Sequence, residues 1–185
     1  NSLLALEENK GLLNNYNESS LFNLFKYIHG INKIFLFAEY NSGFGFIDNL
    51  KLEMDHPKNN WDDSRRIVFY YKIACFYFGN TMNDEVIFWL NKVINEFSGE
   101  LKQDIQCFSR ILSLITHYEM GNEILVSNQI ISVYRFILRM REMGKIQMEI
   151  FRFLRNTTRV NRKSLNPYFK DLKLKLLEIS SDQFE

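Results

Sequence analysis

Apolar positions recur at helical spacing along almost the whole chain, and the residues that break helices fall between the periodic segments. Only 2 prolines and 8 glycines occur in 185 residues, so long stretches are free to be helical. After a weakly amphipathic segment at residues 2–13, the pattern predicts four antiparallel helical hairpins. They cover about residues 21–56, 64–97, 101–143 and 146–180. We therefore expect an all-α fold.

Two of these hairpins are similar to one another, at a constant offset of 41 in residue number. Such self-similarity predicts stacked helix pairs, because one hairpin cannot bury its own apolar face. We expect one domain over residues 1–185, and we expect it to be a fragment of a longer protein because it begins at Asn1 and not at Met. The matched positions are Tyr70, Ile73, Ala74, Tyr77, Val86, Leu90 and Val93 with Ile111, Leu114, Ile115, Tyr118, Ser127, Ile131 and Tyr134.

Local signals predict where the helices begin and end. Gly30 is a predicted break or kink in the first long helix. Asp62 is the first of a group of capping and acidic residues that predict the start of another helix. A Gly-Asn pair ends the first helix of each similar hairpin, at Gly79 and at Gly121.

The last helix, predicted to begin at Asn166, carries one apolar stripe with charged residues opposite, which is typical of a helix that caps a stack. The stripe consists of Leu165, Phe169, Leu172, Leu176 and Ile179, and the opposite side carries Lys170, Lys173 and Glu178.

Residues 70–93 resemble a degenerate tetratricopeptide repeat, because the matched positions fall close to the spacing of that family's packing residues. Residues 111–134 match less well, since Ile115 replaces the small residue of the pattern and Ser127 replaces its usual alanine. The offset of 41 also exceeds the family's period of about 34 residues. The resemblance implies a right-handed stack of antiparallel helix pairs, an α-solenoid, and protein binding as its activity.

Composition sets few limits on the partner. The formal net charge of +1 does not direct the chain toward nucleic acid or an anionic membrane, and no apolar run approaches the roughly 18 residues of a membrane helix. Aromatic residues make up 15% of the chain, and we expect most of them in the core. Cys75 and Cys107 lie in apolar helical patterns, where unpaired thiols favour a reducing compartment, so we expect a cytoplasmic protein without membrane insertion.

The motifs of catalysis are not found. His29, His56 and His117 lie far apart in the sequence, and neither cysteine belongs to a metal-binding pair. Adjacent carboxylates such as Asp62 and Asp63 point about 100° apart on a helix and do not converge. The glycines near residue 44 lack the strand and lysine of a phosphate-binding loop. We expect no catalytic residue, no metal and no cofactor, and hence not an enzyme.

Residues 133–163 form a basic stretch with nine Lys and Arg and two Glu. Arg152, Arg155, Arg159 and Arg162 follow helical spacing, which would place them on one face. Arginine grips planar carboxylates or phosphates with two donors at once. A solvated face paired with acidic neighbours such as Asp171, Glu178 and Asp182 is the simpler interpretation, and both stay open.

A second candidate surface carries tyrosines. Tyr70 and Tyr77 are expected to fill space between hairpins, whereas Tyr71, about 100° further around the helix, is the more exposed. We expect a non-catalytic module that binds a protein or peptide, including an acidic one, through a helical groove and an Arg-rich face. The alternatives are nucleic-acid binding by residues 135–163 and a ligand-sensing regulatory domain. The candidate partner-binding residues are Tyr71, Arg135, Arg139, Arg152, Arg155 and Arg159.

Overall fold

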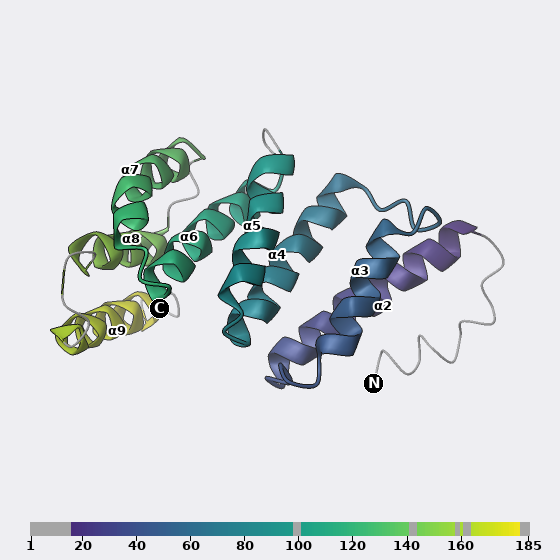
Figure 1. Ribbon diagram of the computed structural model, residues 1–185, viewed down its shortest axis with the longest axis horizontal. Coiled ribbons are helices and arrows are strands. Elements are labelled where there is room, and N and C mark those ends of the chain that lie inside the picture. The colour runs from purple at the N-terminus through teal and green to yellow at the C-terminus, as the bar shows by residue number, and fades with distance from the viewer. Residues whose placement is uncertain (1–15, 98–100, 141–143, 158–159, 161–163, 182–185) are drawn as a thin grey trace. The chain divides into compact units, whose positions relative to one another are not determined.

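The computed structural model describes residues 16–97, 101–140, 144–157, 160 and 164–181. Within these residues every regular element is a helix, which confirms the all-α prediction (Figure 1). The predicted segment at residues 2–13 lies outside the described residues. The helices are α2 (Tyr16–Leu36), α3 (Phe44–Asp55), α4 (Asp63–Gly79), α5 (Asn83–Glu96), α6 (Gln103–Glu119), α7 (Glu123–Met140), α8 (Lys145–Thr157) and α9 (Asn166–Ser181).

Consecutive helices pack as pairs, in agreement with the four predicted hairpins. The pairs are α2 with α3, α4 with α5, α6 with α7, and α8 with α9. The chain divides into two compact units, the N-terminal unit Asn1–Leu101 and the C-terminal unit Lys102–Glu185. Inside each unit the first helix of one hairpin also contacts the first helix of the next, α2 with α4 and α6 with α8. Each unit is therefore built from two hairpins that share a core.

The core of the N-terminal unit combines aliphatic and aromatic side chains. Its rings connect successive helices, because each ring contacts one from the neighbouring element at a centroid distance of 5–6 Å. The prediction that aromatic residues belong mainly to the core holds only in part for this unit: Phe69 and Phe76 are fully buried, whereas Phe25, Phe37 and Phe88 are exposed. The connecting pairs are Tyr27 with Phe46 (α2 to α3), Phe44 with Phe76 (α3 to α4), and Tyr70 with Trp89 (α4 to α5).

The predicted break at Gly30 is wrong, because α2 runs without interruption from Tyr16 to Leu36; the alternative, a kink there, stays a prediction. The glycine has another role. The ring of Phe46 from α3 lies against its Cα, so that a β-carbon at this position would overlap the ring. Gly30 therefore allows α3 to approach α2 closely.

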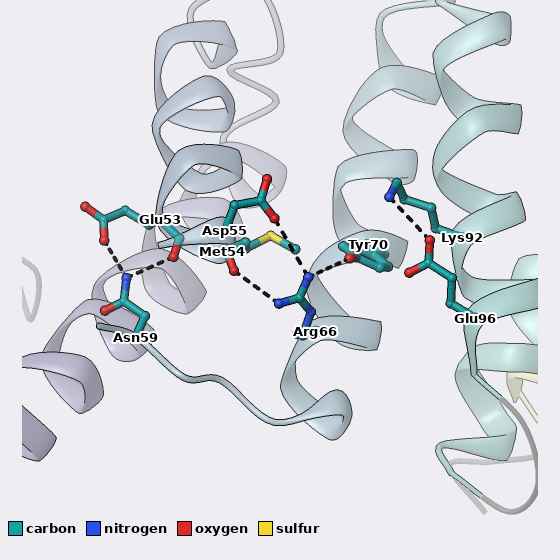
Figure 2. A network of polar contacts seen from close by, with 8 residues as sticks. All are labelled: Glu53, Met54, Asp55, Asn59, Arg66, Tyr70, Lys92 and Glu96. Atoms are coloured by element: carbon teal, nitrogen blue, oxygen red, sulfur yellow. Dashed lines mark hydrogen bonds and ion pairs between the residues drawn. The ribbon is translucent and has the colours of Figure 1, made fainter. Parts of the chain in front are cut away.

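Polar side chains fix the connection between α3 and α4 (Figure 2). The buried Asn59 side chain donates to the Glu53 carbonyl at 2.9 Å and to the Glu53 carboxylate. From the first turns of α4, Arg66 donates to the Met54 carbonyl at 3.2 Å and lies 3.8 Å from Asp55. These bonds satisfy carbonyl groups at the C-terminal end of α3, where positive charge is favoured.

Asp62 is the N-cap of α4, as the acidic start signal predicted. Its carboxylate accepts from the backbone N–H of Arg65 at 2.9 Å. The cap satisfies one of the backbone donors that a helix leaves free at its start. This boundary could be located from sequence because the residues that form it are adjacent in the chain.

The turns of the two similar hairpins have the same backbone bonding at an offset of 40 in residue number, and not 41. The N–H of Met82 donates to the Tyr77 carbonyl at 3.0 Å, and the N–H of Asn122 donates to the His117 carbonyl at 2.9 Å. The left-handed residue of the first turn is Thr81, with φ 57°, and that of the second is Gly121, with φ 82°. The structural counterpart of Tyr77 is therefore His117.

Burial along the second helix of each hairpin agrees with the offset of 40. The buried residues Val86, Leu90, Val93 and Phe97 correspond to Val126, Ile130, Val133 and Ile137, of which Val133 is half-buried and the others buried. The predicted offset of 41 was wrong because it aligned two tyrosines, Tyr77 and Tyr118, that occupy different positions. It also placed Ile131 and Tyr134 in the core, whereas they are 57% and 40% exposed.

The C-terminal unit has a mainly aliphatic core that α6, α7 and α8 share. Its buried members are Cys107, Ile111, Leu114, Val126, Ile130, Ile137, Phe151 and Leu154.

The last helix, α9, contacts α8, and the rings of Phe153 and Phe169 lie 4.8 Å apart. Its predicted apolar stripe is only partly covered, since Leu165 is buried but half of Phe169 is exposed. The opposite side is not purely polar, because Leu174 and Leu177 are exposed there.

Candidate partner-binding pocket

A pocket of about 220 Å³ opens between α7 and α8 in the C-terminal unit. Its base is formed by Ile130 and Phe151, which are buried in the core. More exposed apolar side chains surround this base, and two of the predicted arginines complete the lining. These further residues are Ile131, Tyr134, Met148, Arg152 and Arg155.

The exposed apolar residues of α7 follow from the offset of 40 between the hairpins. Ile131 is the counterpart of Asn91, which is exposed at the same position of α5. In α7 this outward position carries an isoleucine, which gains nothing from exposure to water. The adjacent Tyr134 ring contacts Phe151 edge to face, with centroids 6.0 Å apart, and this contact joins the surface of the pocket to its base.

Arg152 is held in place by its own helix. Its guanidinium donates to the carboxylate of Glu149, one turn earlier, and Lys175 of α9 lies 4.0 Å from the other oxygen of that carboxylate. The Glu149 side chain is only 14% exposed, so its position is restricted by the surrounding protein. Its ion pair with Arg152 holds the Arg152 guanidinium at the edge of the pocket. Arg155 is exposed one turn further along α8. The two predicted residues are thus brought together at one edge of the pocket.

Arg135 and Arg139 of α7 are exposed but do not line the pocket. Ile131, Tyr134 and Leu138 form an exposed apolar stripe at spacings of three and four residues. Because each residue turns a helix by about 100°, Arg135 and Arg139 lie on the side of this stripe away from Tyr134. Tyr134 is on the side that faces α8. Arginines therefore border the apolar surface on both sides.

The two remaining predicted residues do not contribute to the pocket. Arg159 lies outside the described residues, as does Arg162. Tyr71 belongs to α4 in the N-terminal unit and is half-buried, whereas Tyr70 is buried, in the predicted order. Burial raises the pKa of Tyr71, and its hydroxyl is hydrogen-bonded to Cys75. This hydroxyl already has a partner within its own helix.

The pocket lining offers apolar contacts and two cationic groups. Its charged residues are two arginines, which stay protonated and cannot act as a base at neutral pH. Its volume lies below the range of about 300–1,000 Å³ that is usual for cofactor and small-molecule sites. A space of this size fits one large apolar side chain of a partner.

Among the described residues, no group of three or more His, Cys, Asp and Glu is placed to hold a metal ion. None of the described helices combines the length and apolar character that crossing a membrane requires.

Sequence reasoning found the arginines of this site but missed its apolar part, which consists of Ile130, Ile131, Tyr134, Met148 and Phe151. A signal was present in the sequence. Aligned at an offset of 40, the two hairpins differ at the outward position held by Asn91 and Ile131, and Ile131 with Tyr134 and Leu138 forms a contiguous exposed apolar patch, which marks a contact surface.

Comparison of the chain with protein-family models, with curated proteins and with solved structures gave no match.

Proposed function

We propose that this chain is a non-catalytic protein-binding module whose α7–α8 pocket receives an apolar side chain of a partner protein. Arg152 and Arg155, at the edge of the pocket, bind a carboxylate of the same partner. The observation that carries the proposal is an exposed apolar pocket bordered by arginines. The proposal includes a right-handed stack of helix pairs similar to tetratricopeptide repeats, which the pairing of helices within each unit supports.

The chemistry of the pocket supports a protein partner. Aromatic residues, methionine and arginine are enriched at the centre of protein interfaces, and Tyr134, Met148 and Arg152 combine all three at this pocket. A nucleic-acid backbone would contact the arginines but would leave the apolar side chains without a partner. The apolar lining therefore favours a protein over a nucleic acid.

The proposal can be tested with an unbiased library of random peptides displayed on phage. Selected peptides are synthesised, and their dissociation constants are measured by fluorescence anisotropy for the wild type and for Ile131→Asn. That variant places at the pocket the residue that the first hairpin carries at the same position. Leu174→Asn is the matched control, because Leu174 is 61% exposed on α9 and does not line the pocket.

We expect the selected peptides to lose affinity by about tenfold in Ile131→Asn, the equivalent of about 1.4 kcal/mol, and to bind the Leu174→Asn variant as they bind the wild type. A selection that yields no binding peptide, or peptides that bind all three proteins equally, would overturn the proposal.

A further inference from the structure

The lining of the α7–α8 pocket specifies which side chain it receives. We infer that the partner anchors itself with an aromatic side chain, whose ring packs against Tyr134 and Phe151 and beside the guanidinium groups at the pocket edge. This inference rests on the proposed function, because it names the chemical group that enters the same pocket.

The size of the pocket suits a single ring. Its volume is about 220 Å³. An apolar protein cavity of about 150 Å³ is large enough to bind benzene. A phenyl ring therefore fits, with room left for the carbon atom that joins the ring to a peptide backbone.

An aromatic pair in the N-terminal unit shows how such rings are extended in this chain. The Tyr70 ring contacts two others, those of Trp89 and Phe97, at centroid distances of 5.4 and 5.7 Å. At the pocket, Tyr134 and Phe151 form an edge-to-face pair, and the lining residues that the structure describes include no third ring. A ring supplied by the partner would complete a similar group of three.

The arginines at the pocket edge can contact a ring without giving up their bonds within the chain. The ion pair of Arg152 with Glu149 uses N–H groups in the plane of the guanidinium, whereas a ring stacks on the face of that plane. The chain contains an example of this combination. Arg110 donates to the Gln106 carbonyl at 3.0 Å and lies 3.7 Å from the centroid of the Phe136 ring.

An aliphatic anchor would gain only from the burial of its surface. An aromatic anchor gains in addition from edge-to-face contact with the two rings, from the sulfur of Met148 and from the cationic edge, since the face of a ring is electrically negative. Each of these contacts depends on π electrons. The pocket should therefore discriminate between two anchors of the same shape when one of them lacks π electrons.

The test compares phenylalanine with cyclohexylalanine, its saturated analogue, in peptides selected from the phage library. The anchor of each peptide is the position where alanine costs the most affinity for the wild type and costs nothing in Ile131→Asn. Each peptide is then synthesised with phenylalanine and with cyclohexylalanine at that position. Dissociation constants are measured by fluorescence anisotropy.

We expect the phenylalanine peptide to bind at least about fivefold more tightly than the cyclohexylalanine peptide. Burial of apolar surface alone predicts the opposite order, because the saturated ring is the more hydrophobic of the two. The order of the two affinities therefore separates aromatic recognition from simple burial.

A variant of the pocket identifies the source of the preference. Tyr134→Leu keeps an apolar side chain but removes one ring, and it should reduce the preference for phenylalanine to less than about twofold. Tyr168→Leu is the matched control, because Tyr168 is also 40% exposed but does not line this pocket. The preference should be unchanged in the control. Because the preference is a ratio, a general loss of folded protein does not alter it.

The results that would contradict the inference differ in what they imply for the proposed function. If peptides bind through Ile131 but their anchors are aliphatic, or if cyclohexylalanine binds as tightly as phenylalanine, the aromatic inference fails and the pocket remains a protein-binding site. A preference for phenylalanine that persists unchanged in Tyr134→Leu also contradicts the inference. If no peptide is selected, or if the selected peptides bind Ile131→Asn as they bind the wild type, both proposals fail.

Discussion

The ring of Phe46 rests on the Cα of Gly30 where α3 crosses α2. The same ring contacts Tyr27 with centroids 5.2 Å apart, so it cannot easily move away. A glycine in the middle of a long helix normally lowers helix stability, and here that loss is offset by a close approach between two helices.

Replacing Gly30 with alanine should destabilise the protein by about 1–2 kcal/mol, because overlap with the Phe46 ring outweighs the better helix propensity of alanine. The urea midpoint measures this effect. A double variant with Phe46→Leu should recover part of the loss, because the smaller side chain leaves room for the β-carbon, and the two changes should be non-additive by about 1 kcal/mol. Stabilisation by Gly30→Ala alone would show that the helix propensity decides and that the contact is loose.

The shared turn geometry predicts opposite effects for substitutions at its two equivalent positions, Thr81 and Gly121. Thr81 holds a left-handed backbone conformation, with φ 57°, that is unfavourable for a β-branched residue, so Thr81→Gly should stabilise the protein by about 0.5–1 kcal/mol. Gly121 holds the same conformation, and Gly121→Ala should destabilise it by about 1 kcal/mol. Thermal unfolding of both variants shows whether each substitution raises or lowers stability. Effects of the same sign would contradict the equivalence of the two positions.

The connection between α3 and α4 depends on Arg66, which donates to the Met54 carbonyl at 3.2 Å and to the Tyr70 hydroxyl at 3.0 Å. Arg66→Gln should cost about 1–3 kcal/mol of stability in urea unfolding, because both acceptors are left without this donor. The neighbouring Arg65, which is more exposed and lies 3.6 Å from Asp62, provides the matched control. Arg65→Gln should cost less than about 0.5 kcal/mol, and equal losses in the two variants would contradict the network.

His117 should make the stability of the protein fall as the pH drops below the ordinary pKa of histidine. Burial lowers the pKa of His117 from its ordinary value of 6.5, so the unfolded chain binds a proton more readily than the folded one. The stabilising effect of the neutral ring is therefore complete above pH 6.5 and is lost as the pH falls toward the lowered pKa in the folded protein. Urea unfolding between about pH 7.5 and 5 should show this slope, and His117→Gln should reduce it. If the pH dependence of stability is unchanged in His117→Gln, it arises from other titratable groups.

The helices themselves could be predicted from sequence because their signals are local. The spacing of apolar residues and the cap at Asp62 lie within a few residues of the structure that they determine. The role of Gly30 could not be predicted in this way, because it depends on the Phe46 ring, which belongs to another helix. The same holds for the offset between hairpins: two tyrosines matched by type, but backbone bonding in the turns decides which residues are equivalent.

The candidate site shows the same division between local and distant causes. The arginine spacing on α8 was visible in the sequence, and the structure places Arg152 and Arg155 together at the pocket. The exposure of Ile131 follows from the register between the two hairpins, which the backbone bonding of their turns sets and which matching residues by type did not give.

Two adjacent isoleucines test this part of the account. Ile130 is buried and Ile131 is more than half exposed, so Ile130→Asn should cost about 2–4 kcal/mol while Ile131→Asn changes stability by less than about 0.5 kcal/mol. Urea unfolding of the two variants gives both values. A large loss of stability in Ile131→Asn would indicate that Ile131 belongs to the core, as the offset of 41 predicts, and would contradict the pocket.

The central claim is that partners bind at the α7–α8 pocket, and methyl NMR during titration with a library-selected peptide tests it most directly. We expect the methyl signals of Ile131 and Met148 to shift first and furthest, while that of Met82, 40% exposed in the N-terminal unit, stays unchanged. Binding that moves the Met82 signal and leaves those of Ile131 and Met148 in place would contradict the account.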